Sequence, residues 1–299
     1  MIYLKKFDSH ASYDTEINGG GVDLNLPNVS YCKDVKDVHY TPYNLVRFYV
    51  GEISGTTPQT VKIYTDKTNH IDVTVSEGNK WHTYVLPKDK GLSRIESGTY
   101  DEDNEEWSNG IVTKTVIKAN ITANSMPYII PYSTVEASFK GSDTSNVTDM
   151  RNMFSSCSGL TSLDVSSFNT NNVTTMSGMF EYCFKLTSLD LSNFDTSNVT
   201  DMRFMFGNCS GLKSLDVSSF DTSKVTCMIH MFEDCSKLTS LDLSGWVIND
   251  ATDTGNMFNA CDALEEIKMV GCTQDTINKI KAQLTTDLIS IDKVNIITE

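Results

Sequence analysis

The chain has 299 residues, enough for two domains of ordinary size. Its formal net charge of -15 repels nucleic acid and anionic membranes, so we expect neither nucleic-acid binding nor membrane insertion. The first residues contain no apolar core of signal-peptide length, and no stretch reaches the roughly 18 apolar residues of a membrane span. We therefore expect a soluble chain without a secretion signal.

The opening segment, residues 1–43, has a pattern of its own. It contains Lys-Lys-Phe-Asp-Ser-His-Ala-Ser-Tyr-Asp-Thr-Glu-Ile at 5–17, Leu-Pro-Asn-Val-Ser-Tyr-Cys at 26–32 and Val-His-Tyr-Thr-Pro at 38–42. This order of an aromatic-containing helix, a Pro-Asn-Val-Ser-Tyr strand and a Val-x-Tyr strand resembles the opening segment of virion-associated, fibre-type proteins from phages of gut Bacteroidales, including crAss-like phages. The resemblance implies a virion protein that is anchored to other virion proteins through an N-terminal anchoring segment.

Residues 44–126 are expected to form a mainly-β, sandwich-like domain. Apolar residues alternate with polar ones in short segments, which predicts strands with one buried face. The predicted strands lie at 46–50, 61–63, 71–75, 81–85 and 111–121. The acidic stretch 100–107 lacks the Gly and the spaced Glu of a calcium loop, so we expect a solvated loop. Residues 127–142 are expected to be a linker followed by a starter strand, in which Val135, Ala137 and Phe139 alternate.

Residues 143–272 consist of five units that repeat every 26 residues. Two of the repeated positions hold cysteine and phenylalanine, at Cys157, Cys183, Cys209, Cys235 and Cys261, and at Phe154, Phe180, Phe206, Phe232 and Phe258. In the unit that begins at Asp195, the apolar residues of the first half are three and four apart, which predicts a short helix. In the second half Leu215 and Val217 alternate with polar residues, which predicts a short strand. The pattern therefore predicts an α/β-type repeat solenoid with one continuous core and a parallel sheet.

The repeated unit reads Met-Phe-x-x-Cys-x-x-Leu-x-Ser-Leu-Asp-Leu-Ser-x-Phe-Asp-Thr-Ser-Asn-Val-Thr-x-Met. It resembles the BspA-like leucine-rich repeat of bacterial surface proteins, also met in mycoplasma lipoproteins, over residues 143–272. Phe220 stands where the leucine-rich-repeat core usually has Asn. The resemblance implies a leucine-rich-repeat-like fold and, because that family consists mostly of adhesins and surface binding proteins, a role in adhesion or protein–protein interaction. The fold does not by itself fix the function.

The end of the chain departs from the repeat. Trp246, Ala251 and Thr254 replace the Phe, Val and Met of the other units, as is typical of a terminal repeat. Thr273 to Leu284 is predicted to be one helix, and 288–297 a final strand or two. We therefore expect residues 273–299 to be a C-terminal cap.

Two repeated polar or sulfur-containing positions are candidate sites. A column of cysteines along a solenoid does not converge tetrahedrally on a metal, so we expect the five periodic cysteines to be small buried core residues rather than zinc ligands or disulfides. A second column lies on the exposed strand face, at Asp164, Asp190, Asp216 and Asp242. Hydrogen bonds from neighbouring hydroxyls are the favoured interpretation of these aspartates, and a calcium or ligand surface is the alternative.

Residues on the exterior of the predicted helices differ from unit to unit. The candidate binding residues among them are Tyr182, Phe184, Arg203, Phe204 and His230. Unlike aromatic residues on one face of a monotonous repeat indicate contacts specific to that face, with a sister subunit, a virion partner or a host receptor. Packing under loops is the alternative explanation.

The sequence predicts no catalytic, cofactor-binding or metal-binding residues, because its five histidines occur in no nucleophile or carboxylate motif. We expect a non-enzymatic phage fibre or decoration protein, located in the virion, that attaches the particle to a host surface protein or glycan. A homotrimer is one assembly that the sequence leaves open. The first alternative is a BspA-like adhesin on the bacterial cell surface, and the second is a glycan depolymerase. A groove with two close carboxylates would favour the depolymerase.

Overall fold

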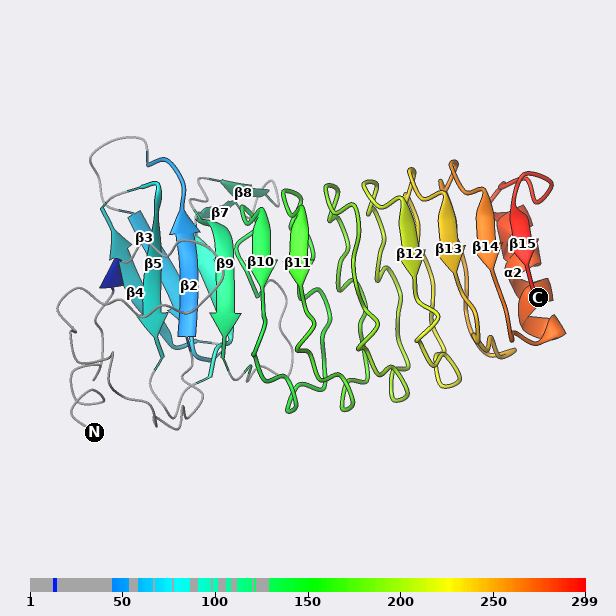
Figure 1. Cartoon of the computed structure of the whole chain (residues 1–299), viewed down its shortest axis with the longest axis horizontal. Coiled ribbons are helices and arrows are strands. Elements are labelled where there is room, and N and C mark those ends of the chain that lie inside the picture. The colour runs from blue at the N-terminus through cyan, green and yellow to red at the C-terminus, as the bar shows by residue number, and fades with distance from the viewer. Residues whose placement is uncertain are drawn as a thin grey trace.

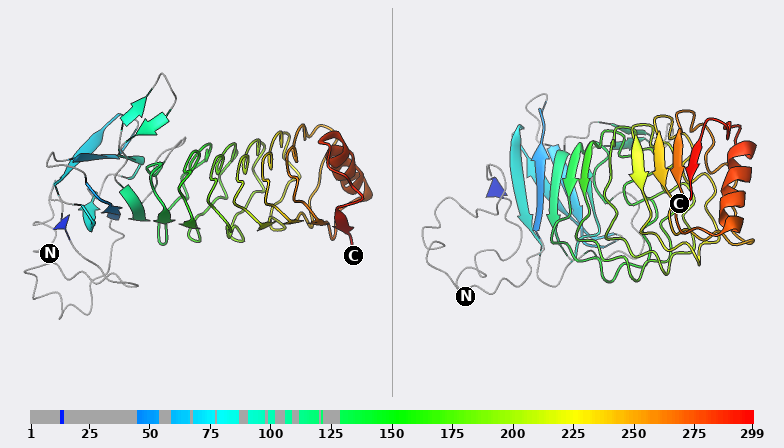
Figure 2. Two further views of the ribbon diagram at one scale, coloured as in Figure 1. Left: turned by 90° about the horizontal axis from the view of Figure 1, so that it is seen from above. Right: turned by 45° about the vertical axis from the view of Figure 1, so that its right-hand side comes forward.

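The computed structural model describes residues 13–14, 45–53, 59–66, 68–76, 78–86, 91–97, 99–101, 106–108, 112–119, 121 and 129–299. In these residues the chain forms an elongated β-solenoid of about seven turns of about 26 residues each, preceded by a small region of β-sheets (Figures 1 and 2). The expected anchoring segment lies outside the described residues except for β1 (Tyr13–Asp14). None of the described helices is long and apolar enough to cross a bilayer.

The described part of the N-terminal β region contains two main sheets and a separate two-stranded hairpin. Its main strands are β2 (Leu45–Val50), β3 (Gln59–Tyr64), β4 (His70–Val75), β5 (Lys80–Val85), β6 (Arg94–Ser97) and β9 (Val112–Lys118). Strand β2 pairs antiparallel with both β5 and β9, while β3 lies between β4 and β6 in the second sheet. All five predicted strands are confirmed, whereas β6 and the hairpin of β7 (Thr99–Asp101) and β8 (Glu106–Ser108) were not expected.

The β region continues into the solenoid without a break in the sheet. Strand β10 (Glu136–Ser138), the expected starter strand, pairs in parallel with β9 on one side and with β11 (Ser162–Asp164) on the other. In the segment expected to be a linker, Ile129 and Ile130 are buried, and the Ile129 N–H donates to the Met153 carbonyl at 3.0 Å. The two halves of the chain therefore share one hydrophobic core.

The second half of four of the five units forms the predicted parallel strand, and only the unit around Leu189 has none. Strands β12 (Ser214–Asp216), β13 (Ser240–Asp242), β14 (Glu266–Lys268) and β15 (Asn295–Ile297) pair in sequence order, with Leu215 opposite Leu241 and Leu241 opposite Ile267. A second line of contact between coils consists of single parallel bridges that join Asp149, Thr175, Asp201, Cys227 and Asp253.

The prediction of a helix in the first half of each unit is wrong, because the structure has turns there. In the unit from Asp195 this stretch is a series of tight turns, in which the Met205 N–H donates to the Met202 carbonyl at 3.2 Å. Phe204 and Asn208 have left-handed φ angles of 55° and 60°, which no α-helix accommodates. The repeat is therefore a β-solenoid of strands and turns, with little helix, and not a helix-plus-strand unit.

The physical reason lies in where the backbone N–H groups donate. A helix would use them within its own segment. Here alternate N–H groups donate to the next coil, as from Phe204 to the Ile229 carbonyl at 3.0 Å and from Phe206 to the Met231 carbonyl at 2.9 Å. The apolar steps of three and four residues fit this chain of turns as well as they fit a helix.

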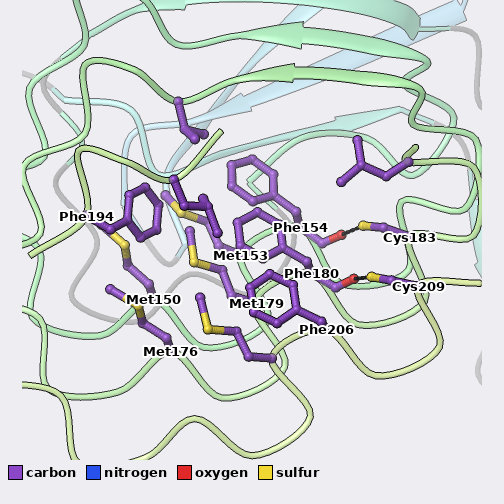
Figure 3. Packing of buried hydrophobic residues seen from close by; sticks show 14 of the residues in the cluster. Met150, Met153, Phe154, Met176, Met179, Phe180, Cys183, Phe194, Phe206 and Cys209 are labelled. Atoms are coloured by element: carbon purple, nitrogen blue, oxygen red, sulfur yellow. Dashed lines mark hydrogen bonds between the residues drawn. The ribbon is translucent and has the colours of Figure 1, made fainter. Parts of the chain in front are cut away.

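The core consists of stacked columns of identical side chains (Figure 3). The phenylalanine rings of neighbouring coils lie nearly parallel, with centroids 5.6 Å apart for Phe154–Phe180, Phe180–Phe206 and Phe206–Phe232. All five periodic cysteines are buried and free of disulfides. The thiol of Cys209 donates to the Phe180 carbonyl of the preceding coil at 3.1 Å, and burial raises the pKa of the Cys157 thiol to about 12. These thiols are therefore protonated core groups, and those of Cys183, Cys209, Cys235 and Cys261 also donate to a backbone carbonyl.

The single helix in the described residues, α2 (Gln274–Thr286), covers the C-terminal end of the core (Figure 1). Thr273 caps it by accepting from the Thr276 N–H, and Ile277, Ile280 and Leu284 are buried. The predicted helix and the predicted final strand, β15, are both confirmed.

Asp287, the residue after α2, supplies the hydrogen-bond acceptor that a further coil would have provided. The Phe232 N–H donates to a carbonyl of the next coil, Met257, at 2.9 Å. Phe258, one coil further on, donates instead to the carboxylate of Asp287, at 2.8 Å. Asp287 is itself buried, and its other oxygen accepts from Gln283 at 2.9 Å. A side chain of the cap thus satisfies a donor that the repeat would leave buried and unpaired.

Replacing Asp287 by leucine should lower the free energy of unfolding by about 1–3 kcal/mol, because the buried Phe258 N–H loses its acceptor. Urea titration would measure the loss. Asp292→Asn, at an exposed position of the same region, is the control and should leave the midpoint unchanged. Equal effects of the two substitutions would contradict the role assigned to Asp287.

Met205→Ala should cost about 2–5 kcal/mol, because Met205 is fully buried between coils and its truncation leaves a cavity. Denaturant titration would measure this. A loss well under 1 kcal/mol would contradict the packing of the methionine column.

Candidate functional site

The face of the solenoid formed by the tight turns carries two exposed aromatic residues in one unit. Tyr182 and Phe184 are 40% and 43% exposed, and their rings meet edge to face at 5.9 Å. The other units have short side chains at these two positions, namely Ser156, Asn208, Asp234 and Ala260, and Ser158, Ser210, Ser236 and Asp262. The aromatic pair is therefore a local departure from the repeat and not a part of its packing.

The backbone holds this pair in place. Tyr182 has a left-handed φ of 62°, which is unfavourable for a bulky residue, and its N–H donates to the Gly207 carbonyl of the next coil at 2.9 Å. The bond between coils fixes the backbone from which the ring projects.

Phe204 and His230, two further candidates from the sequence, lie together in the two coils that follow the coil of Tyr182. The rings of Phe204 and His230 are stacked, with centroids 4.5 Å apart and planes 9° apart. His230 Nδ1 lies 2.8 Å from a carboxylate oxygen of Glu233, and the other oxygen of Glu233 accepts from Asn259 Nδ2 at 2.9 Å. One oxygen of Glu233 therefore accepts a hydrogen bond, and the other lies beside the imidazole of His230.

Glu181 is the electrostatically unusual residue of this face. Burial, and next the negative charge of Glu233, raise the pKa of Glu181 to about 7. Within residues 129–299, no hydrogen bond or ion pair joins its carboxylate to another side chain. Glu181 and Glu233 hold the same position two units apart, and the unit between them has Gly207, which has no side chain to separate them.

We call these six residues, Glu181, Tyr182, Phe184, Phe204, His230 and Glu233, the aromatic–acidic patch. Neither glutamate was among the candidate binding residues predicted from the sequence. Their signal was present in the repeat alignment, because one column reads Ser155, Glu181, Gly207, Glu233 and Asn259. The significance of the column becomes apparent only when the stacking of the units brings the two carboxylates near each other.

The remaining candidate binding residues, Arg203 and the four aspartates of the strand column, form ion pairs or hydrogen bonds with residues of the solenoid itself. Arg203 forms an ion pair with Asp201, two residues earlier, at 2.9 Å. In the strand column, Asp164, Asp190, Asp216 and Asp242 each accept the backbone N–H of the serine two residues later at 3.0 Å. Hydrogen bonds with Ser166 and Ser192 lower the pKa of Asp164 and of Asp190. Each of these carboxylates closes the turn that follows it in the chain. The part of the chain that the structure describes holds no cluster of three metal-ligating side chains.

A family model described as "Mycoplasma protein of unknown function, DUF285" matches residues 129–215 and 186–279, which together make up 151 of the 299 residues. The chain belongs to this DUF285 family. The DUF285 match begins at Ile129, where the first coil starts, and ends within α2, so it covers the solenoid and the patch. No curated protein and no solved structure matches the chain. Nothing in the DUF285 match or the other comparisons supports a phage origin.

Glu181→Gln should stabilise the protein at pH 8 and leave it unchanged near pH 4.5. The pKa of Glu181 lies above its ordinary value in the folded chain, so the folded state retains a proton that the unfolded state loses, and stability falls as the pH rises from about 4.5 to 7. Glutamine removes this dependence, with a gain of roughly 1 kcal/mol at pH 8 after solvent screening. Urea titrations at both pH values, with Glu265→Gln as an exposed control, would measure it. A gain of the same size at both pH values would contradict the assignment.

Proposed function

We propose that this chain is a non-enzymatic binding protein, in which the solenoid is a rigid scaffold that presents the aromatic–acidic patch to a partner. The observation that carries the proposal is the exposed pair of Tyr182 and Phe184, at positions where the other units have short side chains. Exposed aromatic residues grouped on an otherwise polar surface are typical of interaction sites.

The scaffold supports this role energetically. Binding loses less entropy when the contacting residues are already fixed. The backbone of Tyr182 is bonded to the next coil, and Phe204 is fixed by its stacking on His230. The patch therefore needs little reordering when a partner docks.

The setting we propose is a phage virion, in which the solenoid of a fibre or decoration protein contacts the bacterial surface. The support for it is the resemblance of residues 1–43 to virion-associated proteins. A bacterial surface adhesin is the second candidate, and it is favoured by the match to a family described from Mycoplasma and by the resemblance of the repeat to BspA-like surface proteins. Both settings require the same binding role of the solenoid.

A glycan depolymerase would use two neighbouring carboxylates, one of them with a raised pKa. Glu181 and Glu233 meet that description in part. The Glu233 side chain is only 19% exposed, accepts a hydrogen bond from Asn259 and lies 2.8 Å from His230 Nδ1, which favours a structural role for this carboxylate. We therefore propose binding, not catalysis, for these two residues.

Fluorescently labelled full-length protein should bind intact bacterial cells of the source culture, and the double variant Tyr182→Ser/Phe184→Ser should bind at least about tenfold more weakly. Flow cytometry would measure binding. Leu288→Ser, which removes a 92% exposed apolar side chain far from the patch, is the matched control and should bind like the unchanged protein. Undiminished binding of the double variant would show that the patch is not the site.

Immunogold electron microscopy of phage particles and cells from the same culture, with antibody against the solenoid, would decide the setting. Label on virions is the expected result. Label on the cell envelope with clean virions would exclude the phage setting and favour the adhesin.

A further inference from the structure

The aromatic–acidic patch combines two features that the repeat does not require. One is the exposed aromatic surface of Tyr182 and Phe184. The other is the Glu181 carboxylate, which is close to Glu233 and has no cationic or donating partner among residues 129–299. An apolar surface with an uncompensated negative charge at its edge is complementary to a side chain that is apolar along its stem and positive at its tip.

We propose that the patch docks an arginine side chain of a protein partner. The guanidinium lies against Glu181. The aliphatic stem of the arginine, and the apolar residue that precedes it in the partner, pack against Tyr182 and Phe184. The inference rests on the proposed function, since it names the chemistry of the partner for the same surface.

Arginine fits this surface better than lysine does. Its planar guanidinium donates two parallel hydrogen bonds to one carboxylate and also stacks on aromatic rings. Among residues 129–299 the Glu181 carboxylate has no hydrogen-bond or ion-pair partner, whereas Glu233 accepts from Asn259, lies beside His230 and adds only its negative charge. A lysine ammonium would act as a point charge and would gain less from the rings.

The charge of the whole chain favours the same partner. With a formal net charge of -15, the protein attracts basic surfaces and repels acidic ones. Within the patch, His230 lies beside Glu233, and residues 129–299 supply no cation to Glu181.

The test uses the full-length protein at pH 8, where Glu181 is ionised, and two blocked dipeptides, acetyl-leucyl-arginine amide and acetyl-leucyl-citrulline amide. Citrulline has the shape of arginine without its charge. The reporter is the backbone amide of Gly207 in ¹⁵N–¹H spectra, because Gly207 lies between Glu181 and Glu233 in the column and its carbonyl accepts from the Tyr182 N–H at 2.9 Å.

The arginine peptide should shift the Gly207 signal in a saturable way, and the citrulline peptide should bind at least about tenfold more weakly. Glu181→Gln should remove the preference for arginine, whereas Glu265→Gln, the same change of charge at an exposed position away from the patch, should retain it. Added salt should weaken the arginine peptide more than the citrulline peptide.

The absence of a saturable shift, or equal affinity for the two peptides, would overturn the inference. If the double variant Tyr182→Ser/Phe184→Ser still loses cell binding in that case, the binding function stands and only its arginine chemistry is wrong. Conversely, an arginine preference in a protein that binds no cells would leave the site in place and refute attachment to the bacterial surface.

Discussion

The backbone hydrogen bond from one coil to the next is the interaction on which the rest of this structure depends. Neither the short strands nor the turns could bury their backbone alone, because an unpaired buried N–H or carbonyl costs roughly 1–3 kcal/mol. Even buried side chains serve these bonds: the hydroxyl of Thr170 accepts the Asp195 N–H and donates to the Asp195 carbonyl, both at 2.8 Å. The same requirement explains the left-handed residues, whose conformational cost is offset by the bonds they direct to the neighbouring coil.

This constraint separates the residues that build the fold from those that are free to bind. Side chains that point inward must match the coil above and below, so Phe, Met and Cys recur at the same positions. Side chains that point outward meet no such demand, and most are short and polar. The exposed pair of Tyr182 and Phe184 is not accounted for by the packing of one coil on the next, and this is why we assign it to a partner.

The sequence correctly predicted those elements whose pattern of apolar residues fits only one kind of secondary structure. Alternation around Leu215 and Leu241, and the apolar face of Ile277, Ile280 and Leu284, were enough for the strands and the terminal helix. The first half of each unit was predicted wrongly because spacings of three and four residues suit both a helix and successive turns. A sign that favours turns is the Asn or Gly at several left-handed positions, such as Asn152, Gly178 and Asn208, since these types adopt this conformation most easily. Tyr182 and Phe204, which hold the same conformation, give no such sign. The electrostatic contact of Glu181 with Glu233 could not be predicted, because it depends on how closely units two repeats apart approach each other.

The position of the patch follows from how the ends are closed. A stack of identical coils has no natural length, so each end needs an element outside the repeat to satisfy its exposed donors and apolar side chains. At one end β9 and β10 join the solenoid to the β region, and at the other α2 and Asp287 replace the next coil. The units that carry Tyr182 to Glu233 lie between these ends, where every coil is held on both sides (Figure 1). Outward substitutions there leave the stacking contacts intact, so the binding surface can change its chemistry while the scaffold keeps its stability.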